Sequence, residues 1–162
     1  MKTTTKKDRQ FEQLIDRELP KLRGVAFRLL RNAADTDDAI QEALIKAYQR
    51  FDTFKNEAAL SSWVCRIVIN CSFDLLRKRR SEQKHRGEMP PDAPGADTVA
   101  QQNAQDNLLD AIADLPEPYR DAITLGVISG YDGATAAKIL GIAPNALYQR
   151  IHKAKEMLRN TL

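Results

Sequence analysis

The side chains best suited to chemistry in this chain lie along residues 62–80. Ser62, Arg66, Asn70, Asp74 and Arg77 follow one another at steps of four, four, four and three, and Arg77-Lys-Arg-Arg closes the segment. On an α-helix this spacing places the five side chains, here called the polar stripe, along one side. Four consecutive positive charges beside such a stripe favour contact with phosphates, and the alternative is a solvated helix end.

Catalysis has no comparable support in the sequence. We find no phosphate-binding glycine loop, no nucleophile beside a base, and no His and carboxylate pair at metal-ligand spacing. We therefore expect no enzyme activity, no cofactor and no metal. The only cysteines, Cys65 and Cys71, would lie roughly 9 Å apart along a helix axis, which is too far for an undistorted disulfide. A reducing cytoplasm is the simplest expectation.

The charge of the chain is unevenly distributed. The net charge is +3, but residues 1–80 carry 17 Lys and Arg against 11 Asp and Glu, whereas 81–107 carry 2 against 5. A basic excess fits either a solvated surface or a polyanionic partner. The N-terminus is polar and is not a secretory signal, and no apolar run is long enough to cross a bilayer. We expect no membrane insertion.

Helices must position the polar stripe. Apolar residues between Leu60 and Leu75 recur at steps of three and four over four turns, which predicts one helix and excludes a β-strand of ordinary length. Helical spacing also holds over residues 11–30, where Pro20 is expected to open a new turn, and over residues 40–51. The helix over 40–51 is expected to have Asp35 or Thr36 as its N-cap. The stripe is expected to face outward.

The second half of the chain is also predicted to be helical. Residues 81–104 are poor in large apolar side chains and rich in proline, which predicts a flexible linker. Further on, a short helix around Ala134–Leu140, a turn at 141–143 and a helix opened by Pro144 form a helix-turn-helix layout. We therefore predict an all-α fold of two small helical domains, residues 8–80 and 105–162, joined by the linker.

The last predicted helix carries a second set of polar and basic side chains. Leu147, Ile151, Ala154 and Leu158 share its inward face. The side chains left outside or at the flanks can reach base edges and phosphates; they are Asn145, Tyr148, Gln149, Arg150, His152 and Lys153.

Four stretches, taken in order, resemble an extracytoplasmic-function (ECF) sigma factor of bacterial RNA polymerase, a member of the sigma-70 family. They are DTDDAIQEALIKAYQRFDTF, ALSSWVCRIVINCSFDLLRKRR, LLDAIADLPEPYRDAITL and GATAAKILGIAPNALYQRIHKAKEMLR. The resemblance implies a dissociable subunit that binds core RNA polymerase, recognises the −35 and −10 promoter elements and promotes promoter melting without nucleotide hydrolysis. It also implies control by an anti-sigma factor.

The resemblance implies a role for each group of residues. The polymerase clamp would be bound by Asp35, Asp37, Asp38, Gln41 and Glu42. The −10 element would be contacted by Lys55, Asn56, Glu57, Ser62, Arg66, Asn70, Asp74, Arg77, Lys78, Arg79 and Arg80, the first three in a loop that captures a flipped base. The −35 element would be read by Asn145, Tyr148, Gln149, Arg150, His152 and Lys153, in a C-terminal domain that sits on the polymerase flap.

The chain departs from the family pattern at Gly141-Ile-Ala-Pro-Asn-Ala-Leu-Tyr-Gln-Arg, where the proline sits one place later than usual and Tyr148-Gln149 replace Lys-Ser. This difference predicts either an unusual −35 preference or a weaker affinity. Two other hypotheses stay open. A stand-alone helix-turn-helix regulator would have no need of the acidic segment 35–42. A sigma-like decoy that binds only an anti-sigma protein would have no need of the basic residues near 77–80.

Overall fold

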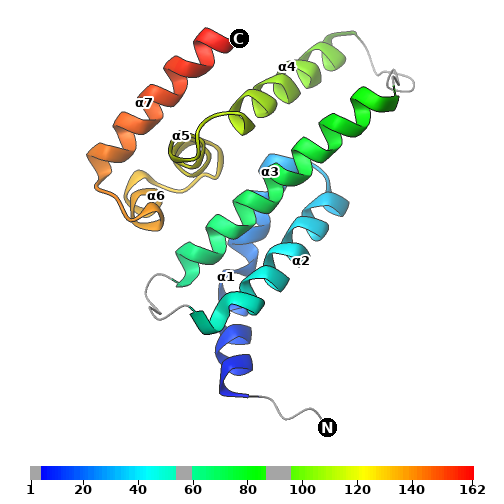
Figure 1. Ribbon diagram of the computed structural model, residues 1–162. Helices are drawn as coiled ribbons and strands as arrows, with labels where there is room; N and C mark the ends of the chain where they lie inside the picture. The colour runs from blue at the N-terminus through cyan, green and yellow to red at the C-terminus, as the bar shows by residue number, and fades with distance from the viewer. Residues whose placement is uncertain (1–4, 54–59, 87–95) are drawn as a thin grey trace.

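The apolar spacing is realised as seven α-helices in this computed structural model, which describes residues 5–53, 60–86 and 96–162 (Figure 1). The helices are α1 (Lys6–Leu30), α2 (Ala33–Arg50), α3 (Leu60–Arg86), α4 (Ala96–Ala113), α5 (Glu117–Ile123), α6 (Gly133–Leu140) and α7 (Pro144–Thr161). A 3-10 turn, η1 (Phe51–Thr53), follows α2, and a π-helical turn, η3 (Thr124–Ile128), continues α5. No β-strand occurs in these three ranges, so the all-α prediction is confirmed.

Helices α1, α2 and α3 pack together as the N-terminal half. Each helix contributes apolar side chains to this core, and the fully covered ones include Leu22 and Leu29 of α1, Ala43 of α2, and Val64 and Val68 of α3. Burying a Val or Leu side chain contributes about 1.5–3 kcal/mol each, so these rows supply most of the force that assembles the half. None of the described helices combines the length and the apolar character needed to cross a membrane.

Helix α1 runs through Pro20 without interruption, so the expected new turn at Pro20 is wrong. Proline inside a helix removes one backbone hydrogen bond and strains the preceding turn. Here Pro20 is exposed, while Leu14 before it and Leu22 after it are both buried against the other helices. Packing on both sides of the proline holds the two parts of α1 on one axis and outweighs the local cost.

The N-cap of α2 is Asn32, not Asp35 or Thr36. Asn32 has extended backbone angles (φ −146°, ψ 153°), and its side-chain oxygen accepts a hydrogen bond of 2.8 Å from the backbone N–H of Asp35. The Thr36 hydroxyl donates to the Asn32 carbonyl at 2.7 Å. Arg31, in the left-handed region at φ 64°, reverses the chain so sharply that α2 begins three residues earlier than expected.

Replacing Asn32 by Ala is expected to lower the free energy of unfolding by about 1 kcal/mol, because the first turn of α2 loses its side-chain acceptor. Urea unfolding followed by circular dichroism measures this change. Asn160→Ala, in the exposed last turn of α7, serves as the matched control and is expected to change stability by less than about 0.5 kcal/mol. Equal effects of the two substitutions would contradict the cap assignment.

Helices α4 to α7 form the C-terminal half, which packs on α3 and also touches the end of α1, where Arg28 donates to the Ile128 carbonyl at 3.0 Å (Figure 1). Asp132 caps α6 by accepting from the Thr135 N–H at 2.7 Å, and Gly141 ends it at φ 66°. Helix α7 then packs through Leu147 and Ala154, both 0% exposed, which completes the predicted helix-turn-helix layout.

The segment expected to be a linker, 81–104, differs from that expectation at both ends. Helix α3 continues to Arg86, and α4 begins at Ala96. Residues 81–86 read Ser-Glu-Gln-Lys-His-Arg, and most of these have good helix propensity even though they lack an apolar face. Because only 87–95 separate the two helices, the connection between the halves is shorter than the composition of the segment indicated.

Candidate nucleic-acid interface

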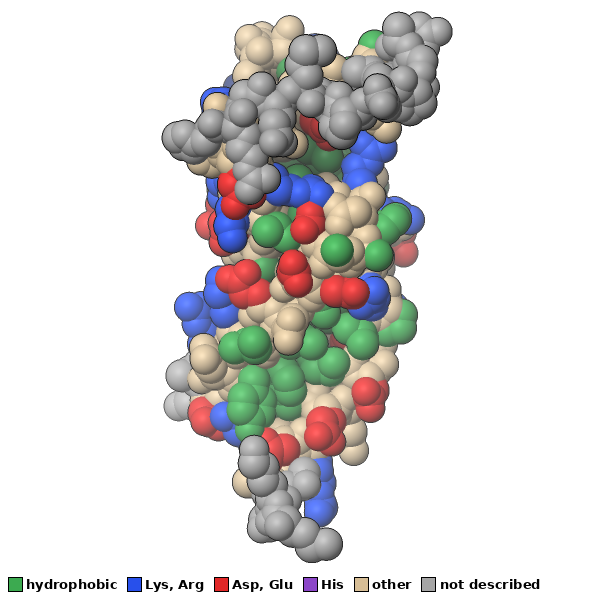
Figure 2. Space-filling view, turned by 90° about the vertical axis from the view of Figure 1, so that its right-hand side faces the viewer, with side chains coloured by type: hydrophobic (Ala, Val, Ile, Leu, Met, Phe, Trp, Pro, Cys, Tyr) green, Lys and Arg blue, Asp and Glu red, His purple; other side chains and the backbone are tan. Residues whose placement is uncertain are grey.

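Helix α2 presents an acidic face with an apolar continuation. Asp37, Asp38, Gln41 and Glu42 are all exposed on it, as helical spacing requires of these positions. Ile45 (53% exposed) and Tyr48 (40% exposed) continue the same side of the helix. Figure 2, which looks at the side of the molecule where α2 lies, shows acidic side chains in a band with a hydrophobic patch below it. Exposed apolar patches bordered by charge are typical of protein interfaces.

Asp35 lies apart from the other residues predicted to bind polymerase. Its carboxylate forms an ion pair with Arg79 of α3 and accepts a 2.9 Å hydrogen bond from the Asn32 amide. Asp37 instead pairs with Arg23 of α1 at 2.6 Å and remains 58% exposed. Ile45 was missed in the sequence analysis, although a signal was present. It falls outside the buried spacing of Ile40, Ala43 and Ala47 and so had to point outward.

Arg66, Asn70 and Asp74 of the polar stripe are exposed, as expected, but the stripe also borders the C-terminal half. Arg66 forms an ion pair of 3.7 Å with Glu117 of α5, and Asn70 accepts a hydrogen bond from Arg120 of the same helix. Arg77 donates to the Ala113 carbonyl of α4 at 2.5 Å and pairs with Asp74 at 3.4 Å. Three members of the stripe therefore contact the C-terminal half.

The cause is a second apolar row on α3. Cys65, Ile69 and Phe73 are 3%, 0% and 0% exposed, and they lie at steps of four, next to the polar stripe. The Arg120 guanidinium lies 5.1 Å from the centre of the Phe73 ring. Burial raises the pKa of the Cys65 thiol to about 12, with further contributions from Glu18 of α1 and Asp121 of α5. Because this row packs on the C-terminal half, the neighbouring stripe lies at the edge of that contact, where its side chains reach partners and stay in part exposed.

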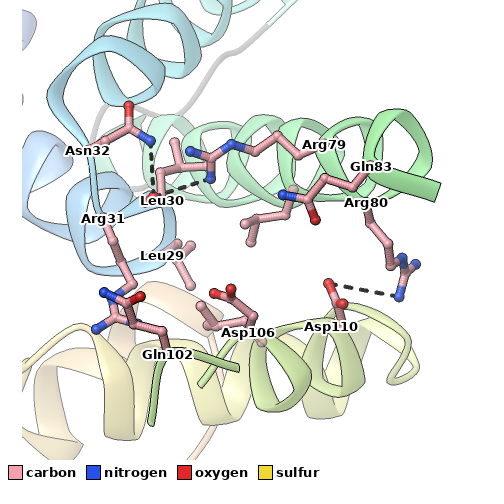
Figure 3. A pocket seen from close by; sticks show the side chains of 12 residues that line it. Leu29, Leu30, Arg31, Asn32, Arg79, Arg80, Gln83, Gln102, Asp106 and Asp110 are labelled. Carbon is pink, nitrogen blue, oxygen red and sulfur yellow. Dashed lines mark hydrogen bonds and ion pairs between the residues drawn. The ribbon is translucent and has the colours of Figure 1, made fainter. Parts of the chain in front are cut away.

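The basic end of α3 meets carboxylates across a polar cavity of about 400 Å³ between α3 and α4 (Figure 3). Arg80 forms two hydrogen bonds of 3.2 Å with Asp114 and a longer ion pair of 3.9 Å with Asp110. The hydrogen bond to Asp114 raises the pKa of the Arg80 guanidinium above its ordinary value. Arg79 turns toward the end of α1, where it donates to the Leu30 carbonyl at 3.3 Å, and Lys78 is exposed.

The polar face of α7 is open. Five of its six predicted residues are exposed and the sixth, Arg150, is half-buried; the exposed residues are Asn145, Tyr148, Gln149, His152 and Lys153. Tyr148 is 60% exposed and lies over the start of α6, where a Cβ on Gly133 would come within 2.8 Å of its hydroxyl. Gly133 therefore leaves room for Tyr148, and the Asp132 cap supports the helix start that this glycine weakens.

The structure brings the predicted residues together only in part. Of the remaining stripe members, Ser62 is half-buried and Asp74 is exposed. Lys55, Asn56 and Glu57, predicted to capture a flipped base, lie outside the described residues. The α3 residues lie at the border of the C-terminal half and most of them keep solvent exposure, whereas five of the six α7 residues are fully exposed and the sixth is half-buried.

Comparison with known proteins gives two family matches. The family described as Sigma-70 region 2 matches residues 14–82, and the one described as Sigma-70, region 4 matches residues 105–158. ECF RNA polymerase sigma factor SigM of Mycobacterium tuberculosis strain Erdman is 32% identical over 152 residues, which cover 94% of this chain and 76% of that protein.

Two further similarities point to the same family. ECF RNA polymerase sigma factor SigW of Bacillus subtilis is 28% identical over 170 residues and covers 94% of this chain and 88% of its own length. The solved structure of the sigma factor RpoE in complex with the anti-sigma factor NepR from Bartonella quintana matches with a TM-score of 0.53 and 27% identity, over 93% of this chain and 95% of that one.

Proposed function

Because the chain belongs to the ECF group of the sigma-70 family, we propose that it binds core RNA polymerase, selects promoters by their −35 and −10 elements and helps to melt them. One observation carries the proposal. Both sigma regions occur in order on one chain, and each supplies a helix with polar and basic side chains at nucleic-acid-reading spacing. The protein acts by recognition rather than by chemistry of its own.

The exposed face of α2 is the proposed contact with the polymerase clamp. Asp37, Asp38, Gln41 and Glu42 supply charge and hydrogen-bonding groups, and Ile45 supplies apolar area at the centre of the same side. Interfaces of this composition combine a desolvated apolar centre with a polar rim. Asp35 is withdrawn from this role in the free chain, because it is held by Arg79 and Asn32.

Helix α3 is the proposed −10-reading element. Arg66, Arg77 and Arg80 would neutralise phosphates, and Asn70 would hydrogen-bond a base edge. Unstacking a base step costs a few kcal/mol, which such contacts offset without nucleotide hydrolysis. The proposed flipped-base residues Lys55, Asn56 and Glu57 precede this helix in the sequence.

Helix α7 is the proposed −35 reader, entering the major groove of duplex DNA. Its exposed amide and phenol groups can hydrogen-bond base edges, while Lys153 and Arg150 can contact phosphates. We also expect an anti-sigma factor as regulator, because the similar RpoE was solved as a complex with one. Tyr148 and Gln149, which replace Lys-Ser of the family pattern, are the residues proposed to set an unusual −35 preference.

Transcription in vitro tests the proposal. Purified core RNA polymerase, a genomic fragment library and the full chain are combined, and transcripts are sequenced from their 5′ ends. We expect new start sites that share two upstream elements and that appear only when the chain is present. Identical transcripts with and without the chain would contradict the proposal. Footprints on duplex DNA without polymerase would instead favour a stand-alone regulator.

A further inference from the structure

An apolar groove lies where the end of α1 meets α4, η3 and α7, next to the polar cavity of Figure 3, with which it shares Arg31 and Leu109. Its volume is about 780 Å³. Ile112, Ile123 and Leu158 line it as a buried floor and are 2%, 5% and 6% exposed. Small-molecule sites are typically apolar hollows of about 300–1,000 Å³ with a few polar groups. The groove has this size and composition.

Large apolar side chains at the groove stay exposed to water. Phe27 of α1 and Val127 of η3 are both 51% exposed, and Leu108 of α4 is 39% exposed. Seven large apolar side chains are exposed in the part of the chain that the structure describes, and three of them line this one groove. Single exposed apolar residues are ordinary, whereas a group of them marks a binding surface.

The charged side chains of the groove are all basic. Arg28 and Arg31, at the end of α1, and Lys155 of α7 line it and are exposed, and no carboxylate is among the described residues that line it. Arg28 donates to the Ile128 carbonyl at 3.0 Å, and none of the three cations forms an ion pair with another described residue. Cations without carboxylate partners beside a hollow raise the local concentration of anionic ligands.

We propose that the groove binds a single-chain carboxylate amphiphile of the fatty-acid type, with its tail on the apolar floor and its carboxylate against Arg31 and Lys155. A guanidinium can bond both oxygens of a carboxylate, and an ammonium adds a further charge-assisted contact. Phe27 and Val127 would cover the tail. This inference goes beyond the proposed function, because none of the lining residues is assigned to DNA or polymerase.

Two features favour a small carboxylate over a phosphate and over a macromolecule. None of the lining residues lies in the first turn of an α-helix, so they do not offer the backbone N–H groups that commonly hold phosphates. The exposed apolar area is confined to three side chains around one hollow, whereas a standard protein interface covers about 800 Å² on each partner.

Isothermal titration calorimetry of the full chain with dodecanoate, kept below its micelle-forming concentration, tests the proposal. The double variant Arg31→Asn and Lys155→Gln removes the two cations. Asn tolerates the left-handed region in which residue 31 lies (φ 64°), and Gln matches Lys in helix propensity. The matched control, Lys21→Gln and Lys138→Gln, changes the net charge equally at exposed positions outside the groove. Circular dichroism verifies that each variant keeps its helical content.

We expect the unmodified chain and the control to bind dodecanoate with equal affinity, and the double variant to bind it about tenfold more weakly, because two charge-assisted contacts are lost. Octanoate should bind more weakly than dodecanoate, since its shorter tail buries less apolar surface. Dodecylammonium, with the same tail and the opposite charge, should show no binding at the same concentrations. Dodecanoate should also raise the unfolding temperature of the control more than that of the double variant.

Equal affinities of the double variant and the control for dodecanoate would overturn the proposal, as would equal binding of dodecylammonium. An absence of saturable binding would also overturn it and would leave the groove to an acidic helix of another protein. Sedimentation velocity without ligand tests for a second copy of the chain in the groove, and self-association that the double variant abolishes would overturn the proposal. None of these measurements uses polymerase or DNA, so their failure is distinguishable from failure of the proposed function.

Discussion

Replacing Asp37 and Asp38 together by Lys is expected to abolish co-purification with core RNA polymerase. The substitutions reverse the charge of two exposed side chains in the proposed clamp contact. Like charges placed across an interface cost several kcal/mol, enough to lose a complex during washing. The fold should survive, because the cap of α2 is Asn32 and the one ion pair of Asp37 is solvent-exposed, a type that contributes about 0–1 kcal/mol.

The experiment is a pull-down of purified core polymerase on the tagged chain. Asp16→Lys combined with Glu12→Lys is the matched control, because it makes the same charge change on the exposed side of α1. Circular dichroism and thermal unfolding check that both variants remain folded. Retention of polymerase by the variant of Asp37 and Asp38 would refute the assignment of α2.

Replacing Phe73 by Ala is expected to lower the free energy of unfolding by about 3–5 kcal/mol, the range observed for large aromatic side chains truncated in a core. Phe73 is 0% exposed and is among the largest fully buried side chains of the described residues. It also supports Arg120, whose guanidinium lies over its ring. Since natural domains are stable by about 5–15 kcal/mol, this single change removes a large share of the total.

Urea unfolding followed by circular dichroism measures the effect of Phe73→Ala. Phe27→Ala is the matched control, because Phe27 is 51% exposed, and the change there is expected to be below about 0.5 kcal/mol. Comparable destabilisation by the two substitutions would show that the packing described around Phe73 is not what holds the protein together.

Helical periodicity was sufficient to predict the helices but not how they pack against one another. The spacing of Val64, Val68 and Cys71 correctly predicted one long helix and its buried face. The same helix carries Ile69 and Phe73 on a second buried row, and that row brings the polar stripe to the edge of the C-terminal half. Whether a polar side chain faces water or a partner 50 residues away is decided by tertiary contacts, which a local pattern does not contain.

Local chemistry explains the smaller differences. Asp35 and Thr36 have good N-cap side chains, but Asn32 shares this property and lies directly after the left-handed Arg31, so it caps the helix. Pro20 is a reliable helix breaker only where packing does not hold both sides, and in α1 Leu14 and Leu22 do so. Ile45 could have been identified by noticing that an apolar residue stood on the polar side of its helix.

The contacts between α3 and the C-terminal half differ in their response to heat and to dissolved ions. Hydration of charged groups becomes less favourable on warming, so the exchange of water for partners at Arg66, Arg80 and Arg120 costs less at higher temperature. Dissolved salt weakens these contacts, because its ions screen the exposed pairs. The Debye length is about 8 Å at physiological ionic strength. The charged contacts between the halves are therefore expected to weaken more with rising salt concentration than with rising temperature.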